Sequence, residues 1–105
     1  MKVAITSEGN SLNNKIDARF GRASYFAIYD SETDKVEFFL NEGKDAPEGA
    51  GPAAVRFIAN KGASKVVSGE FGFKIKSLLE DLDIQMVIMD TQKTIAEVVE
   101  LMRNK

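Results

Sequence analysis

Short apolar blocks alternate with polar turns in the first part of the chain. Residues 2–6 form an apolar run, and residues 24–30 are aromatic and β-branched enough to form a second strand. Between residues 35 and 40, apolar side chains recur at every second position, the period that places them on one face of a strand. The pattern therefore predicts a hairpin of residues 24–30 and 35–40, with the later strand at the edge of a sheet.

Helical spacing replaces this pattern after residue 51. A helix is predicted from about Pro52 to Asn60, because proline suits the first turn and Gly62 follows where a left-handed C-terminal cap is expected. A second amphipathic helix is indicated further along by apolar residues at the spacing i, i+3, i+4 and i+7. Those residues are Ile75, Leu78, Leu79 and Leu82.

Two more strands and a last helix complete the pattern. Residues 65–68 and the almost wholly apolar residues 84–89 are the strands, and Thr94 and Glu97 have the capping-box spacing that predicts the start of a helix. Alternating helices and strands imply right-handed crossovers and a parallel sheet covered on both faces. We therefore expect an α/β protein of three layers, α/β/α, in which residues 1–105 form a single domain. Its mixed five-stranded sheet has the order 3-2-1-4-5, with strand 2 antiparallel.

The composition of the chain excludes several classes of function but does not identify one. The chain has 105 residues, a net charge of −2, and neither histidine nor cysteine. Disulfides and thiolate chemistry are therefore excluded, and the interspersed charges do not form the basic surface typical of a nucleic-acid binder. No apolar run approaches membrane-spanning length, and no secretory signal pattern is present. We expect a cytoplasmic protein that binds neither nucleic acid nor membrane.

The segment Arg19-Phe20-Gly21-Arg22-Ala23 is the strongest candidate for a binding site. Arginine offers a planar fork of donors for carboxylate, phosphate or sulfide-rich anions, and glycine lets a ligand approach the backbone. In the predicted topology this segment folds over the crevice where the winding of the sheet reverses, between strands 1 and 4. The candidate ligand-binding residues are Thr6, Ser7, Arg19, Phe20, Gly21, Arg22, Gly69 and Gly72.

A purely structural interpretation of the same segment stays open. Arg19 would then pair with Asp17 or with the end of a helix, Phe20 would pack in the core, and Gly21 would only turn the chain. Gly49-Ala50-Gly51-Pro52 could also present N–H groups to an anion. However, no strand directly precedes this stretch and Pro52 removes a donor, so a flexible helix entry is the better interpretation.

The chain offers little for catalysis. Serine, cysteine and zinc enzymes draw on residue types that are absent here. The carboxylates Glu8, Asp17, Glu70 and Asp90 have no diagnostic spacing and are interpreted as solvated surface acids, so no metal ligands are predicted. The predicted strand order is that of the ribonuclease-H-like fold, whose nucleases carry an acid on the first strand, but residues 2–6 contain none. We therefore expect a non-catalytic protein.

The order and spacing of these motifs resemble one known family over essentially the whole chain. The motifs are Met1 to Ser7, Phe20-Gly21-Arg22-Ala23, Gly49 to Pro52, Lys65-Val66-Val67 with Gly69 and Gly72, and Thr94 to Val98. Together they resemble the dinitrogenase iron–molybdenum cofactor biosynthesis family, the nitrogenase accessory factor-like domains. The resemblance implies a ribonuclease-H-like fold and a non-catalytic role in carrying an iron–molybdenum or iron–sulfur cluster, with a cluster-assembly or acceptor protein as partner.

One residue departs from the family pattern. Members commonly carry histidine immediately before Phe-Gly-Arg, whereas this chain has Arg19 there, so direct ligation by imidazole or thiolate is impossible. Two modes of cluster binding remain possible. Arg19, Arg22 and backbone N–H groups could hold an anionic cluster by electrostatic attraction, or a partner or small molecule could supply the other ligands of the metal. Two alternatives stay open: a binding module for an anionic metabolite such as a nucleotide or phosphate ester, and a protein-interaction domain that uses the exposed edge from Val36 to Leu40.

Overall fold

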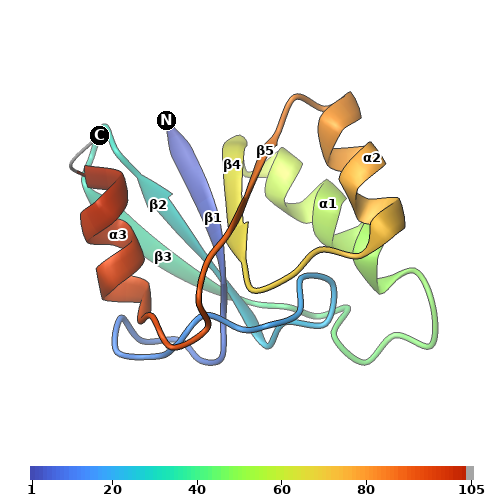
Figure 1. The fold of residues 1–105 in the computed structure, drawn as a ribbon, viewed down its shortest axis with the longest axis horizontal. Coiled ribbons are helices and arrows are strands. Elements are labelled where there is room, and N and C mark those ends of the chain that lie inside the picture. Colours follow the sequence, from blue (N-terminus) through green and yellow to red (C-terminus); the bar gives the residue numbers. More distant parts are fainter. Residues whose placement is uncertain (104–105) are drawn as a thin grey trace.

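A mixed sheet of five strands lies at the centre of the computed structural model, which describes residues 1–103 (Figure 1). The sheet order is β3-β2-β1-β4-β5. Strand β2 pairs antiparallel with both β1 and β3, whereas β4 pairs parallel with β1 and β5, so the predicted order and orientations are confirmed. The elements are β1 Lys2–Ser7, β2 Tyr25–Asp30, β3 Lys35–Leu40, α1 Ala50–Asn60, β4 Ala63–Ser68, α2 Phe73–Asp81, β5 Gln85–Ile88 and α3 Ile95–Arg103.

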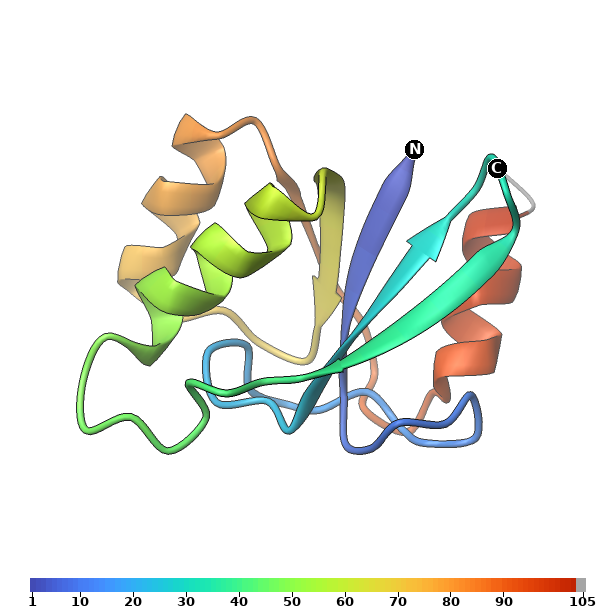
Figure 2. The same cartoon turned by 180° about the vertical axis from the view of Figure 1, so that it is seen from behind.

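Helices cover the two faces of this sheet separately. Helices α1 and α2 lie on one face and α3 lies on the other, as the two opposite views show (Figures 1 and 2). Central β1 is buried on both faces, with Ala4 in the core under α1 and α2, and Val3 and Ile5 in the core under α3. This double burial explains why β1 is a continuous apolar run. Grouping this topology with the ribonuclease-H-like folds stays a prediction.

Local signals set the ends of the helices much as predicted. Gly62 follows α1 with φ +82°, the left-handed conformation expected of a C-terminal glycine. Before α3, the Thr94 N–H donates to Glu97 Oε1 at 2.9 Å and the Glu97 N–H donates to Thr94 Oγ1 at 3.2 Å, which is the predicted capping box. Helix α1 begins at Ala50, earlier than the predicted start at Pro52.

The predicted amphipathic helix is present as α2, but only half of its apolar stripe is buried. Ile75 and Leu79 are buried, but Leu78 is 36% exposed and Leu82 is 51% exposed. Helix α2 ends at Asp81 and lies beside β5, the edge strand, where there is less sheet to cover. Exposure of the β5 residue Ile88, at 63%, has the same cause.

The segment between β1 and β2 is fixed to the start of α3. The N–H groups of Ile95 and Ala96 donate to the carbonyls of Asn14 and Leu12, each at 2.9 Å. These bonds satisfy two of the donors that a helix leaves free at its N-terminus, so the 7–16 loop has a defined path and caps α3. No helix within residues 1–103 is long and apolar enough to cross a membrane.

Candidate functional site

Asp17 organises the turn that follows β1. Its buried carboxylate accepts the backbone N–H of Arg19 at 3.0 Å through Oδ1 and that of Ser24 at 3.2 Å through Oδ2. Its main chain joins the ends of two parallel strands, because the carbonyl accepts from Thr6 Oγ1 at 2.8 Å and from the Gly69 N–H at 3.3 Å. The prediction that Asp17 is a solvated surface acid was therefore wrong.

Phe20 anchors the turn in the core. Only 3% of this residue is exposed, and its ring lies 5.9 Å from the Phe26 ring and 5.7 Å from the Phe71 ring, measured between centroids. Phe26 belongs to β2 and Phe71 to the connection between β4 and α2, so two aromatic contacts fix the turn against a strand and a neighbouring loop. The part of the structural interpretation that concerned Phe20 is thus confirmed.

Gly21, Gly51 and Ile75 bring the arginine turn into contact with α1 and α2. A Cβ added to Gly21 would lie 2.8 Å from the backbone of Gly51, and one added to Gly51 would lie 2.4 Å from Ile75 Cδ1. A side chain at Gly21 would meet main chain, whereas one at Gly51 would have to displace the end of the Ile75 side chain. The first turn of α1 therefore packs closely against the arginine turn because Gly21 has no Cβ.

The two arginines of the turn have different surroundings. Arg22 Nη1 donates to the carbonyls of Lys44 at 2.9 Å and Ala46 at 2.8 Å, which ties the turn to the loop between β3 and α1. The Arg19 side chain is 54% exposed, and its one recorded ion pair within residues 1–103 is a 3.5 Å contact from Nε to Asp17 Oδ1. Arg22 is therefore a structural tie, whereas the Arg19 side chain is more than half exposed to solvent.

A pocket of about 340 Å³ opens where the turn meets the two helix starts, and we call it the arginine pocket. Neither α1 nor α2 has a side-chain cap or an acidic residue in its first turn. The positive ends of two helix dipoles therefore lie at this pocket, although Pro52 offers no N–H and the N–H groups of Ala53 and Ile75 already donate to the carbonyls of Gly49 and Gly72. It is lined by Arg19, Phe20, Gly21, Arg22, Gly49, Ala50, Gly51, Glu70, Gly72 and Ile75.

The arginine pocket contains only some of the residues predicted for the site. Arg19, Phe20, Gly21, Arg22 and Gly72 line it, whereas Thr6, Ser7 and Gly69 do not. The Thr6 and Ser7 hydroxyls are buried and donate to the carbonyls of Asp17 and Gly9. A Cβ on Gly69 would lie 2.7 Å from Ala18 Cα, so the close approach at this glycine is made by the chain itself.

Sequence reasoning undervalued the residues that open α1. Gly49, Ala50 and Gly51 line the pocket, although this stretch was interpreted as a flexible helix entry. The sequence signal was the pair of glycines, Gly49 and Gly51, at the start of the helix. This pair indicates a pocket only once the fold places it beside the arginine turn. The other candidate acids, Glu8, Glu70 and Asp90, are exposed. No group of three or more His, Cys, Asp or Glu residues placed to hold a metal ion occurs within residues 1–103.

The fold and pocket define a class: an α/β protein with an open pocket, lined by two arginines and two helix starts, next to the topological switch point of its sheet. The family model described as "Dinitrogenase iron-molybdenum cofactor" matches residues 1–105, so the chain belongs to this family. An uncharacterized protein of Methanocaldococcus jannaschii, MJ0580, is 27% identical over 94 residues, which cover 87% of this chain and 76% of that protein.

Two solved structures share the fold closely. The apo form of the orange protein from Desulfovibrio gigas is 29% identical with a TM-score of 0.90, covering 98% of this chain and 87% of that one. A Thermotoga protein of the DUF35 family, provisionally named a NifB protein, is 30% identical with a TM-score of 0.83 and the same coverage.

Proposed function

We propose that the chain is a non-catalytic carrier that holds an anionic metal–sulfur cluster, or a precursor of one, in the arginine pocket. Membership of the iron–molybdenum cofactor family supports a role connected with that cofactor. The observation that carries the proposal is local: two uncapped helix N-termini meet beside the exposed Arg19 guanidinium. All three features favour negative charge.

The residues present suit an anion that keeps its own ligands. With no histidine or cysteine in the chain, the metals of a cluster cannot be bound by imidazole or thiolate. Sulfide or oxo groups at the surface of a cluster can instead accept hydrogen bonds from Arg19 and from backbone N–H groups at the starts of α1 and α2. The cargo would thus be held by charge and hydrogen bonds, and released without breaking a metal–protein bond.

The energies involved suit reversible carriage. A helix N-terminus stabilises a nearby anion by roughly 0.3–1 kcal/mol at an exposed position. A charge-assisted hydrogen bond from arginine contributes roughly 1.5–3 kcal/mol. Two helix starts and one arginine therefore favour an anion by a few kcal/mol, and Glu70 at the rim reduces that sum.

An anaerobic titration tests the proposal. The full chain is titrated with isolated iron–molybdenum cofactor and, separately, with a thiolate-ligated [4Fe–4S] cluster, and complex formation is followed by gel filtration with metal analysis. We expect a one-to-one complex that Arg19→Ala weakens at least about tenfold, the loss of one charge-assisted contact. Arg56→Ala is the matched control, since Arg56 is exposed on α1 and outside the pocket. Equal affinity in both variants, or no complex, would contradict the proposal.

The second candidate function is the binding of an anionic metabolite in the arginine pocket, and the backbone N–H donors of that pocket favour it. Phosphate groups bind readily at helix N-termini, and the pocket has two such termini. Nucleotides and phosphate esters would then raise the melting temperature of the chain, because they bind only the folded state. A shift that Arg19→Ala reduces, in a chain that binds neither cluster, would favour this candidate over the carrier.

A further inference from the structure

Strand β3 is an open edge of the sheet, and its outward backbone groups can be assigned. The Asn41 N–H donates to the Ser24 carbonyl, so Asn41 faces β2, and the residues that face β2 alternate along an antiparallel strand. Val36, Phe38 and Leu40 therefore direct their N–H and C=O groups away from the sheet. Such a row of unpaired donors and acceptors is a template for another strand.

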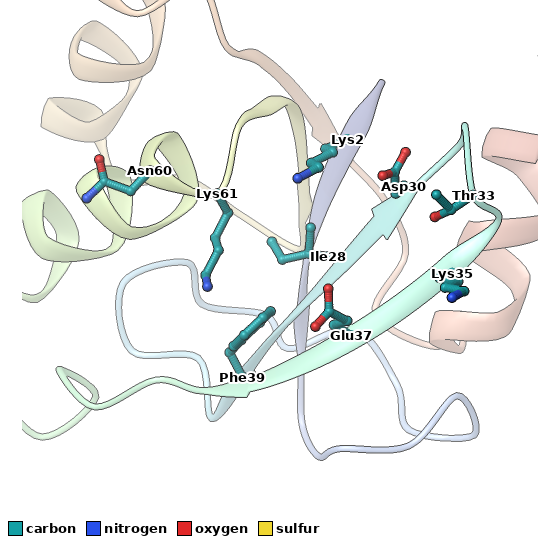
Figure 3. A pocket seen from close by; sticks show the side chains of 9 residues that line it. All are labelled: Lys2, Ile28, Asp30, Thr33, Lys35, Glu37, Phe39, Asn60 and Lys61. Atoms are coloured by element: carbon teal, nitrogen blue, oxygen red, sulfur yellow. The ribbon is translucent and has the colours of Figure 1, made fainter.

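A hollow flanks this edge on the face of the sheet that carries α1, and we call it the lysine hollow (Figure 3). It measures about 430 Å³ and its floor contains Phe39, with Lys61 Nζ 4.1 Å from the ring centroid. Lys2 and Lys35 also line it, and none of these three lysines forms an ion pair within residues 1–103. Glu37 projects from β3 between Lys35 and Phe39.

An apolar groove flanks the same edge on the opposite face. It measures about 420 Å³, and its apolar walls are Leu12, the β3 residues Val36 and Phe38, and the α3 residues Ala96 and Val99. The charged residues Asp34, Glu100 and Arg103 also line it. The side chains of β3 thus alternate between the two depressions: Lys35, Glu37 and Phe39 face the lysine hollow, whereas Val36 and Phe38 face the groove. An added strand would have its own side chains alternate in the same way.

We propose that β3 binds an extended segment of another protein as a sixth strand. Its apolar side chains would enter the groove beside Val36 and Phe38, and its acidic side chains would face Lys35 and Lys61. The outward backbone groups of β3 would supply the hydrogen bonds, and the two depressions would select the side chains of the partner. In strand addition, main-chain hydrogen bonds usually provide the affinity and side-chain pockets the specificity. This inference is independent of any cargo in the arginine pocket.

A second copy of the chain is disfavoured in one of the two central registers. Two β3 strands related by a two-fold axis through their centre, in the register that overlaps residues 35–39, would place Glu37 directly opposite Glu37. Like charges opposite each other destabilise an antiparallel pair. In this register Glu37 acts against self-association and favours a different partner with a basic residue at that position. The register that overlaps residues 36–40 would pair Phe38 with Phe38, so a test for a dimer accompanies the experiment.

A displayed library of random extended peptides, selected against the full chain, tests the proposal. We expect enriched sequences to alternate apolar and charged residues, with acids at the positions facing Lys35 and Lys61. A synthesised enriched peptide should slow hydrogen exchange at the amides of Val36, Phe38 and Leu40. No enrichment, or protection of other amides, would overturn the proposal. Protection of β3 without peptide, in a concentration-dependent dimer, would overturn it in favour of a second copy.

A proline at Leu40, whose N–H points away from the sheet, distinguishes the effect of backbone pairing from that of side-chain contact. Leu40 is 59% exposed, so Leu40→Pro removes an outward N–H with little loss of core, and edge strands tolerate such a proline. Leu40→Pro should weaken the peptide at least about tenfold through one lost main-chain bond and its unpaired partner, while Leu40→Ala should have less than about a threefold effect. Lys35→Glu should shift the selection from an acid to a base at the facing position. Unchanged binding to Leu40→Pro, with native melting temperature, would contradict strand addition.

Discussion

Gly21 and Gly51 lie so close together that a Cβ on Gly21 would come within 2.8 Å of the Gly51 backbone. Gly21→Ala forces the arginine turn and the start of α1 apart, because the obstacle is main chain. We expect the free energy of unfolding to fall by roughly 1–3 kcal/mol, as in other overpacked sites, which urea denaturation would measure. Gly43→Ala is the control, since its Cβ would meet only ordinary contacts at 3.7 Å and beyond. Equal stability of both variants would contradict this account.

Asp17→Asn should loosen the same turn without changing its shape. An amide offers one acceptor oxygen, so one of the N–H groups of Arg19 and Ser24 would face an NH₂ group. We expect a loss of roughly 1–3 kcal/mol, the cost of an unsatisfied buried donor, together with faster hydrogen exchange at Arg19 and Ser24. The exposed Asp45→Asn serves as the control. If both variants unfold at the same urea concentration, the carboxylate has no organising role.

Arg22→Ala should act on the loop between β3 and α1 before it acts on a ligand. Arg22 Nη1 holds the carbonyls of Lys44 and Ala46, so the variant frees that loop. We expect faster hydrogen exchange at residues 44–48 and a loss of roughly 1–2 kcal/mol, reduced from the buried case by partial exposure. Arg19→Ala should leave both quantities nearly unchanged. If Arg19→Ala, and not Arg22→Ala, speeds exchange at residues 44–48 and lowers stability, Arg19 rather than Arg22 holds this loop.

Acid stability should depend on Asp34, which joins the β2–β3 turn to α3. Hydrogen bonds from Arg103 and from the Tyr29 hydroxyl, each 2.9 Å long, lower the pKa of Asp34 below the ordinary 3.8. A lowered folded-state pKa contributes stability that is complete above pH 3.8 and is lost as the pH falls through the folded-state value.

Asp34→Asn removes that titration and keeps a residue that tolerates the left-handed backbone at this position, where φ is +58°. Thermal unfolding of both proteins between pH 6 and pH 2 is the measurement. The stability difference between wild type and variant should shrink as the pH falls below about 4. A difference that is constant with pH would show that the pair of hydrogen bonds does not depend on the charge of Asp34.

Local sequence signals predicted the fold well because they act over a few residues. Gly62 ends α1 and the Thr94–Glu97 box begins α3 through contacts within one helical turn. Leu82 belongs to the apolar stripe from which the second helix was predicted, yet it is exposed because burial depends on how much sheet lies beneath the helix.

The candidate site was less predictable because its roles are tertiary. Arg19 and Arg22 are the same residue type three positions apart, and only the carbonyls of Lys44 and Ala46 distinguish them. Asp17 carries no signal of burial in the sequence, since the N–H groups that compensate its charge converge only when the turn closes.

The arginine pocket has walls from three stretches that are far apart in the chain, at residues 19–22, 49–51 and 70–75. A nascent chain therefore has no such pocket until α2 has left the ribosome and packed against α1. Any molecule held there can be loaded only after folding, and its binding energy stabilises all three stretches at once. Conversely, local opening of a single wall is enough to let that molecule go.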